Sequence, residues 1–435
     1  MKINSILAVC LYTTMLYSCK SGSMNLFKPS SPHEIYQRKL IAAGLDRSNL
    51  GLSWINSSLT SNDKALNISI PYKETGYFPA DKTPSHFYKF AAVKGQKISI
   101  SLDKKSANTS PIYLDVWEIK ETKISNHIAS ADTLGSVLEL DIKDSGAYLL
   151  RIQPELLQSW GYTLEITSGP SLGFPTKTGG NNIKSYWGDG RENNLRKHEG
   201  VDIFGSFRSP VLATSDGRVT RVNENKLGGK VIWFKPKGKD YTLYYAHLDE
   251  QIAIEGQEFL AGETLGLMGN TGNAKSTPTH LHFGIYSSSG AIDPFPFINP
   301  NLKVPANISA PLSNLNKTLR TKSDQILKGT SAQNSNRDLP KGTIVKISAA
   351  SGNGYRVILP DGAVGFLNSS NLISVSSPIS TLKLSAKQLK LYDEPDTLAA
   401  VKMNLQQASI VNLLGSFEGF HLISLDEDRF GWIKQ

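Results

Sequence analysis

Cysteines, long apolar runs and dense basic clusters are scarce in this chain of 435 residues. Both cysteines, Cys10 and Cys19, lie among the first 20 residues, so no disulfide framework can hold the rest of the chain together. No apolar run reaches the 18 or more residues that a membrane-spanning helix needs. The formal net charge is +9, but the basic residues are spread out and do not alternate with aromatics, which argues against a nucleic-acid partner.

The composition that is present is typical of a turn-rich β protein with packed cores. Hydrophobic residues make up 39% and charged residues 20%, which is compatible with burial of sizeable cores. The 36 glycines and 21 prolines indicate many turns. At about 100–200 residues per domain, the length predicts two to four domains. A mildly positive chain also suits contact with anionic envelope polymers or lipid surfaces.

The first 19 residues have the pattern of an export signal. Lys2 precedes a mostly apolar stretch from Ile6 to Tyr17 that is too short to span a membrane. Leu16-Tyr17-Ser18-Cys19 resembles a bacterial lipobox, which implies that Cys19 is acylated and anchors the mature chain to a membrane. Ordinary signal cleavage nearby is the alternative. Both interpretations predict export to the bacterial cell envelope, facing the periplasm or wall, and neither decides between inner and outer membrane.

Residues 20–65 are expected to hold a tether and a helical segment. Residues 20–30 are rich in Ser, Lys and Gly, as flexible tethers are. Ser31-Pro32-His33-Glu34 reads as a capping box with proline at the first helical position, and Gly44 would end that helix.

Residues 66–168 alternate polar and apolar side chains in short runs separated by turn residues, about ten residues apart, which predicts an antiparallel β-sandwich. Gly95 before one run, and Ser145-Gly146-Ala147-Tyr148 before another, resemble the pre-peptidase sandwiches of secreted bacterial proteases. We favour the simpler interpretation of a spacer. The predicted strands cover residues 87–90, 97–102, 113–117, 137–140, 148–152 and 162–166.

The C-terminal part contains an internal repeat, after a linker at Pro305–Pro311. A shift of 66 residues places Ile344-Val345 on Ile410-Val411 and Gly365-Phe366 on Gly431-Trp432. Such a register predicts two copies of one small β-barrel, at 308–376 and 380–435. The repeated unit resembles bacterial SH3-like domains, which implies binding of cell-wall peptides; the alternative is a structural barrel without a ligand.

Half of the eight histidines lie within 85 residues, in the stretch 172–300. Clustered imidazoles with a nearby carboxylate indicate a metal site. The clustered histidines are His198, His247, His280 and His282. The others, which we expect to be solvated or hydrogen-bonded, are His33, His86, His127 and His421.

These four histidines lie in three predicted structural elements. Gly200 and Val201 argue that His198 lies in a loop entering a strand, so that it could meet Asp202 across a bend. His280 and His282 alternate with apolar residues, which places both imidazoles on the same face of a strand. His247 is expected near the end of another strand. A catalytic zinc site takes three protein ligands, so one carboxylate and two imidazoles would leave two histidines for proton transfer.

The order of these motifs, H-x-x-x-D, then Tyr-x-His-Leu, then H-x-H-F-G, resembles the lysostaphin-type zinc endopeptidases of peptidoglycan. The resemblance covers residues 172–300 and implies a mostly antiparallel β catalytic domain holding one zinc ion. Carried over by position, it implies that His198, Asp202 and His282 are the metal ligands. It also implies that His247 and His280 flank the bound water as catalytic groups.

Taken together, the sequence predicts a mainly β chain: an antiparallel β catalytic domain, flanked by a β-sandwich and two small SH3-like barrels, with a short N-terminal helix. The predicted function is an exported zinc endopeptidase that cuts stem peptides or cross-links of peptidoglycan. The alternatives are a catalytically silent peptidoglycan-binding protein or amidase activator, and a general exported protease or zinc-buffering protein. The sequence leaves open which bond is cut, whether a regulatory partner opens the site, and the oligomeric state.

Overall fold

The computed structural model describes residues 30–434 apart from 60–64, 83–84, 106–109, 122, 135–136, 178–179, 192, 330–334, 386–387 and 427. The predicted export signal, the lipid site at Cys19 and the tether before Ser30 lie outside the described residues. The described chain is mainly antiparallel β, which confirms the predicted fold class. None of its helices combines the length and apolar character that crossing a membrane requires.

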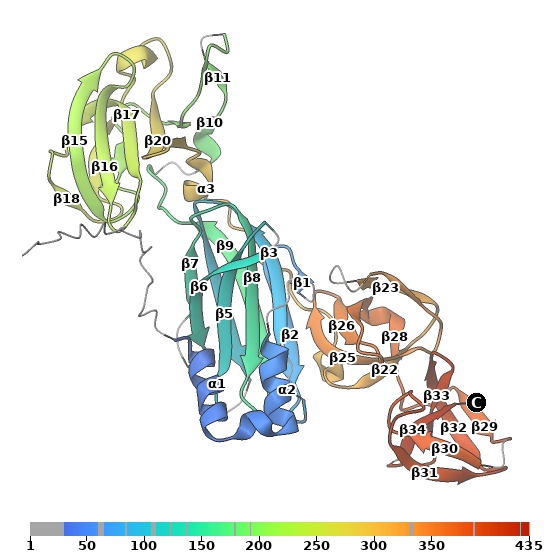
Figure 1. Cartoon of the computed structure of the whole chain (residues 1–435). Helices are drawn as coiled ribbons and strands as arrows, with labels where there is room; N and C mark the ends of the chain where they lie inside the picture. The colour runs from blue at the N-terminus through green and yellow to red at the C-terminus, as the bar shows by residue number, and fades with distance from the viewer. Residues whose placement is uncertain are drawn as a thin grey trace, which may run out of the picture.

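Two helices cover the outer face of a sandwich (Figure 1). α1 (Pro32–Ala42) begins with the predicted capping box: the Ser31 hydroxyl accepts from the Glu34 amide, and the Glu34 carboxylate accepts from the Ser31 amide. A short turn, η1 (Leu45–Arg47), leads to α2 (Asn49–Ser58), a second helix that the sequence analysis did not predict. Trp54 of α2 is 1% exposed and donates from its indole nitrogen to the Pro154 carbonyl, which fixes the helices on the sheet below.

The sandwich is made of two sheets that enclose a core of alternate, inward-facing side chains such as Tyr88, Val116 and Leu164. One sheet has the order β1-β3-β8-β5-β6, and the other contains β2-β9-β4-β7. All six predicted runs overlap strands, whereas β1, β2 and β6 were not predicted. The bounds of the strands in the first sheet are β1 Leu66–Asn67, β3 His86–Ala92, β8 Gly146–Pro154, β5 Ile112–Lys120 and β6 Lys123–Asp132, and those of the second are β2 Tyr72–Phe78, β9 Trp160–Pro170, β4 Gln96–Lys104 and β7 Leu138–Asp141.

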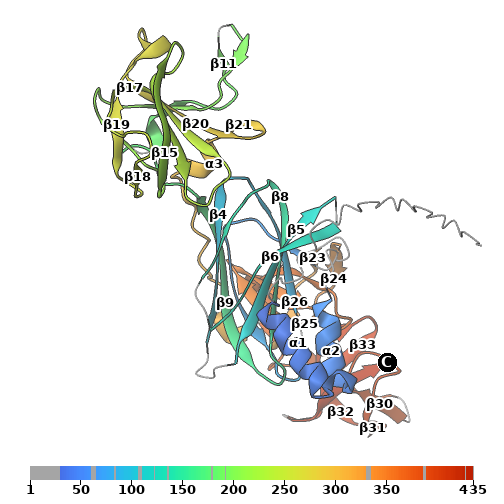
Figure 2. The ribbon, with the colours of Figure 1, turned by 60° about the vertical axis from the view of Figure 1, so that its left-hand side comes forward.

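After β9 the chain forms a third sheet. It has ten strands, and its central order is β10-β13-β20-β17-β16-β15-β18. One face of this sheet packs on a hydrophobic core that includes Ile203, Tyr245 and Phe283. The bounds of its strands are β10 Ile183–Ser185, β13 Val201–Phe204, β14 Pro210–Leu212, β15 Gly217–Asn225, β16 Gly229–Pro236, β17 Thr242–Gln251, β18 Glu258–Phe259, β19 Thr264–Met268, β20 His280–Ser287 and β21 Gly290–Ile292. A separate hairpin, β11 (Gly190–Arg191) with β12 (Arg196–Lys197), projects beside it, as Figures 1 and 2 both show.

This sheet domain rests on one end of the sandwich through the short helix α3 (Phe295–Ile298). Phe297 packs so closely on Gly95 that a Cβ there would lie 2.3 Å from its ring, so only glycine fits. The Leu172 amide donates to the Phe297 carbonyl at 2.9 Å, and Lys239 forms an ion pair with Asp141 of β7. Helices α1 and α2 lie at the opposite end of the sandwich (Figure 2).

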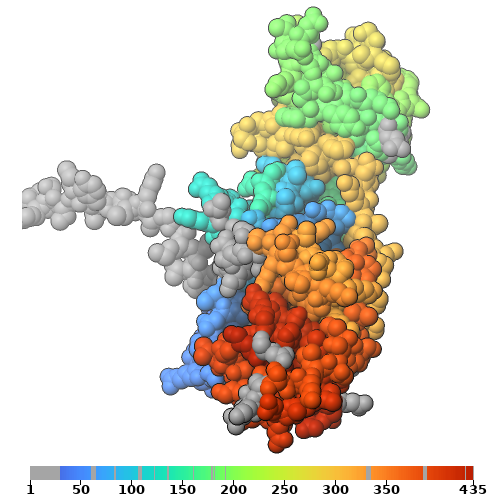
Figure 3. Space-filling model, turned by 90° about the vertical axis from the view of Figure 1, so that its right-hand side faces the viewer, coloured from blue at the N-terminus to red at the C-terminus, as the bar shows by residue number. Residues whose placement is uncertain are grey.

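The repeat of 66 residues is visible in the C-terminal strands: β25, β26 and β27 recur as β32, β33 and β34 with every bound shifted by that number. Figure 3 shows these two modules, in orange and red, stacked on each other at the far end from the ten-stranded sheet. The first contains β22 Thr318–Thr321, β23 Gln325–Gly329, β24 Arg337–Leu339, β25 Ile344–Ser351, β26 Gly354–Ile358, β27 Val364–Asn368 and β28 Leu372–Ser374; the second contains β29 Ser380–Lys383, β30 Gln388–Tyr392, β31 Val401–Gln406, β32 Ile410–Phe417, β33 Phe420–Ser424 and β34 Phe430–Lys434.

The first C-terminal module shares a sheet with the sandwich. β25 pairs with β2 through Ala349 and Ala350, so that one sheet of eleven strands runs through both units. Arg356 of β26, 4% exposed, reaches into the sandwich toward Glu74, which is fully buried. The module is therefore joined to the sandwich by backbone hydrogen bonds and a buried ion pair.

Candidate metal centre

The candidate site lies on the face of the ten-stranded sheet that is turned away from its core. Leu281, Phe283 and Ile285 of β20 point into the core, so the alternation sends His280 and His282 to the opposite face. In the antiparallel register, His282 lies across from Asp202 of β13 on one side and Ala246 of β17 on the other. The strand pairing therefore brings together residues that are 80 positions apart in sequence.

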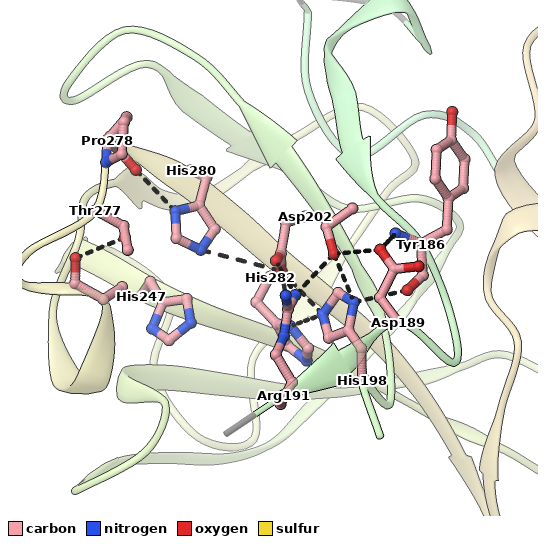
Figure 4. Close-up of polar contacts among 12 residues, drawn as sticks. Tyr186, Asp189, Arg191, His198, Asp202, His247, Thr277, Pro278, His280 and His282 are labelled. Atoms are coloured by element: carbon pink, nitrogen blue, oxygen red, sulfur yellow. Dashed lines mark hydrogen bonds and ion pairs between the residues drawn. The ribbon is translucent and has the colours of Figure 1, made fainter. Parts of the chain in front are cut away.

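His198 completes a compact group of donor atoms (Figure 4). It stands just before β13, where the predicted loop enters the strand. Its Nε2 lies 3.0 Å from His282 Nδ1 and 3.0 Å from Asp202 Oδ1, and His282 Nδ1 is also 3.0 Å from Asp202 Oδ1. The three donors form a nearly equilateral triangle.

The chemistry of this triangle fits a metal ion. His198 Nδ1 lies 2.9 Å from the Tyr186 carbonyl, which can only accept, so Nδ1 carries the proton and Nε2 presents its lone pair to the triangle. That lone pair faces a carboxylate oxygen and a second imidazole, an arrangement that a shared cation stabilises. A zinc ion with Zn–N distances of about 2.0–2.1 Å and tetrahedral angles would hold its donors roughly 3.3 Å apart, close to the separations seen here.

The electrostatics of the site favour an ionised Asp202 carboxylate and a neutral His282 imidazole. Burial acts to raise the pKa of Asp202, but hydrogen bonds and charges from His198 and His282 outweigh it and hold that pKa well below its ordinary value. Burial lowers the pKa of His282, and the neighbouring Asp202 only partly opposes this effect. One carboxylate and two neutral imidazoles are a donor set that zinc accepts.

His247 lies at the side of this triangle in a left-handed backbone conformation with φ of 63°, which is costly for a residue with a Cβ. Its amide donates to the Gly228 carbonyl at 2.7 Å, and its Nδ1 donates to the Thr271 carbonyl at 2.9 Å. These bonds fix the ring with its centroid 5.0 Å from that of His280 and 5.9 Å from that of His282. Burial, followed by the neighbouring imidazoles, lowers the pKa of His247 to about 4.

His280 approaches the group from the other side. Its Nδ1 donates to the Pro278 carbonyl at 2.8 Å, and its ring stacks on Phe204 with the centroids 5.0 Å apart. The free Nε2 is 4.0 Å from Asp202 Oδ1. His247 and His280 thus have the same hydrogen-bonding arrangement. In each ring, Nδ1–H donates to a backbone carbonyl, so Nε2 carries the lone pair and can accept a proton.

The structure brings all five predicted site residues into this one group. The other four histidines lie elsewhere: His33 hydrogen-bonds Gln153, and His127 pairs with Asp115. His33, His86 and His421 each also have one buried ring nitrogen without a hydrogen-bond partner among the described residues. Tyr186 points its half-exposed phenol away from the group and packs on Phe295 (Figure 4).

Sequence reasoning missed the residues that hold the site residues in place. The carbonyls of Thr271 and Pro278 carry no side-chain signal, so no pattern could identify them. Sequence reasoning also gave no role to Arg191, although its guanidinium donates to Asp202 Oδ2 at 2.6 Å. A lone arginine seven residues before a histidine has no distinctive spacing.

Sheet and donors together define a β-rich domain with a candidate metal centre on its open face. The profile of peptidase family M23 matches residues 196–294. An L-Ala–D-Glu endopeptidase of Bacillus subtilis is 34% identical over 127 residues, which is 26% of this chain and 39% of that protein. The murein hydrolase activator NlpD of Escherichia coli is 35% identical over 102 residues, which is 23% of this chain and 26% of that protein.

Solved structures of similar sequence include the catalytic domain of the antimicrobial peptidase lysostaphin from Staphylococcus simulans. It is 31% identical, with 27% of this chain and 92% of that domain covered and a TM-score of 0.25. The first curated relatives are matched over 21 to 39% of their own length. Residues 196–294 thus resemble peptidase family M23, whose members are zinc metallopeptidases.

Proposed function

We propose that this protein is an exported zinc endopeptidase that hydrolyses peptide bonds in the stem peptides or cross-links of peptidoglycan. The observation that carries the proposal is the triangle of His198, Asp202 and His282, with the free Nε2 atoms of two further imidazoles beside it. The similarity to the B. subtilis L-Ala–D-Glu endopeptidase supports a peptide bond as the substrate, and the similarity to the murein hydrolase activator NlpD supports peptidoglycan as its source.

The donor triangle would hold one zinc ion. Zinc supplies such a site with a bound water of lowered pKa and with polarisation of the scissile carbonyl. The contribution of this chain is to keep three donors within 4.8 Å of one another on a rigid sheet, so that little reorganisation accompanies binding.

His247 and His280 are the proposed catalytic groups. Each is locked as the tautomer with its proton on Nδ1, because the Thr271 and Pro278 carbonyls can only accept. Each Nε2 can therefore take a proton from an attacking water and return it to the leaving amine. Their low exposure, 7% for His247 and 5% for His280, limits competing contact with bulk water.

A second candidate function is activation of another murein hydrolase without catalysis, which the similarity to NlpD supports. The two functions make different demands on the site. An activator needs the domain surface, whereas an endopeptidase needs the donors and both flanking imidazoles, and this chain retains all five residues. We therefore favour the endopeptidase.

The remaining parts of the chain support action at the cell envelope. The predicted lipobox at Cys19 would anchor the protein to a membrane, and the similarity to the E. coli lipoprotein YgeR, 34% identical over 104 residues, favours an anchored form. The C-terminal modules, predicted to be SH3-like, would hold the enzyme near its polymer and raise the effective substrate concentration. The sandwich at 66–168 would act as a spacer.

The test is digestion of peptidoglycan sacculi by the purified protein, with and without a zinc chelator, with fragments identified by mass spectrometry. We expect chelator-sensitive release of peptide-cleaved muropeptides with intact glycan. His280→Ala should retain zinc and lose turnover, and His282→Ala should lose both, while His421→Ala in the second C-terminal module is the matched control. No release from the zinc-loaded protein, together with stimulation of a murein amidase, would instead support the activator.

A further inference from the structure

The guanidinium of Arg191 reaches the metal centre from outside the sheet (Figure 4). One of its terminal nitrogens lies 2.6 Å from Asp202 Oδ2 and 2.8 Å from the Ser185 hydroxyl. The Arg191 side chain is 32% exposed and that of Asp202 10%. This charge-assisted pair therefore stands at the boundary between the donor group and solvent, where screening is incomplete.

The hairpin that carries Arg191 is tied to the backbone of a ligand residue. The His198 amide donates to the Asp189 carbonyl at 2.8 Å, and the Gly188 amide donates to the His198 carbonyl at 2.9 Å. Two pairs farther along, Arg191 faces Arg196 in the β11–β12 ladder. The position of the guanidinium is thus set by the same backbone segment that positions His198.

The two carboxylate oxygens of Asp202 have different partners. Oδ1 faces His198 Nε2 and His282 Nδ1 at 3.0 Å each, whereas Oδ2 is occupied by the guanidinium. The guanidinium occupies one lone pair of Oδ2, so Oδ1, which already faces the two imidazoles, is the oxygen presented to a metal. This arrangement suits a four-coordinate site, in which three protein ligands leave one position open.

A second branch of the same network reaches His198. The Ser185 hydroxyl, which accepts from Arg191, donates to Asp189 Oδ2 at 2.8 Å and lies 3.2 Å from His198 Nδ1. One guanidinium thus contacts one proposed ligand directly and a second through a single hydroxyl. Removing it would loosen both residues together.

We infer that Arg191 is a positioning residue of the metal centre, which holds Asp202 as a one-oxygen ligand. This inference rests on the proposed zinc site and extends it beyond the donors themselves. Residues that hydrogen-bond metal ligands change metal affinity by about 10–100-fold when they are replaced. We expect a loss in that range for Arg191→Gln.

The first measurement is the zinc dissociation constant of the whole chain, obtained by competition with a chromophoric chelator. Arg191→Gln should bind zinc about 10–100-fold more weakly than the wild type, and Arg191→Lys, which keeps the charge but not the planar fork, should lie between them. Arg208→Gln is the matched control, because Arg208 is an exposed arginine of the same domain that pairs with Asp249 and Glu250. Thermal unfolding of each variant reports whether it is folded.

The second measurement is the visible spectrum of the cobalt(II)-substituted protein, which a purely structural role would leave unchanged. With Oδ2 released, Asp202 can bind through both oxygens, so the coordination number rises and the absorption of Arg191→Gln should weaken relative to the wild type. Wild-type affinity and an unaltered cobalt spectrum in a folded Arg191→Gln would refute the inference, as would an equal loss in Arg208→Gln. Failure of the wild type itself to bind zinc would instead refute the proposed function.

Discussion

The joint between the sandwich and the first C-terminal module gives the sharpest prediction about stability. Arg356 contacts Glu74 Oε1 at 3.3 Å, and its guanidinium also donates to the hydroxyls of Tyr162 at 3.0 Å and Tyr88 at 3.3 Å. Those two hydroxyls, with that of Tyr72, donate to the Glu74 carboxylate at 2.5–2.7 Å. The cluster is closed, because each buried charge has its counter-charge and its hydrogen bonds within it.

Arg356→Met should remove the counter-charge and leave a carboxylate with no solvent exposure. Breaking a buried pair in this way costs about 3–5 kcal/mol, and since three hydroxyls still serve Glu74, we expect about 3 kcal/mol. At a urea dependence of roughly 3 kcal/mol/M, the unfolding midpoint should fall by about 1 M. The double variant Glu74→Gln with Arg356→Met should be less destabilised than Arg356→Met alone, because no unpaired charge remains.

Urea unfolding followed by circular dichroism and tryptophan fluorescence tests this. Arg337→Met is the control: Arg337 lies in the same module, its side chain is 30% exposed, and it pairs with Asp361 and Glu418. Its loss should cost at most about 1 kcal/mol. A midpoint for Arg356→Met within the range of the control, or a separate transition for the C-terminal module, would refute the reasoning. The same joint predicts that truncation after Asn301 yields an unstable chain, so wall binding should be tested by point substitutions.

Three further predictions concern other parts of the chain. Burial, with a smaller effect of Arg151, lowers the pKa of His33 to about 4, below its value of 6.5 in the unfolded chain. The contribution of neutral His33 to the free energy of unfolding should therefore be fully present above pH 6.5 and fall by about 3 kcal/mol towards pH 4. His33→Gln should flatten this pH profile in thermal unfolding. Ser31→Ala should cost about 1 kcal/mol in urea unfolding through loss of the capping box, and no change would contradict that role. Gly200→Ala would place a Cβ 2.6 Å from His282 Cε1, so zinc affinity should fall in the chelator competition while thermal stability changes less.

The parts of the fold that sequence could predict are those with a strong local signal. The capping box at Ser31, the alternating runs of the sandwich and the repeat of 66 residues all match elements of the structure. α2 was missed because it has only 10 residues and because its N-cap, Ser48, lacks the acidic partner that would complete a capping box. β6 was missed because most of its side chains are at least partly exposed, which weakens the alternation on which strand prediction depends.

The sequence could indicate the candidate site residues, but not the backbone groups and strand pairings that hold them in position. Alternation alone places His280 and His282 on one face, and a bend before Val201 brings His198 toward Asp202. The choice of His198, Asp202 and His282 as ligands came from the resemblance to a family and not from local patterns. The strand register that sets Asp202 opposite His282, and the carbonyls that orient His247 and His280, depend on pairings between distant segments. No single-sequence pattern specifies those pairings.

The eleven-stranded sheet shared by the sandwich and the first C-terminal module also affects how far the candidate metal centre lies from the N-terminal helices. Gln153 and Pro154, at one end of β8, contact α1 and α2, whereas Gly95 and Pro170, at the other end of the sandwich, lie beside α3 and the ten-stranded sheet. The nine residues of β8 span roughly 30 Å at about 3.3 Å per residue. Because the pairing of β2 with β25 and the buried Arg356–Glu74 pair stiffen the sandwich between these ends, the metal centre is held a fixed length away from the N-terminal helices. With an anchor at Cys19, the flexible tether predicted at residues 20–30 and then the length of the sandwich would separate the proposed enzyme from its membrane, as the spacer interpretation expects.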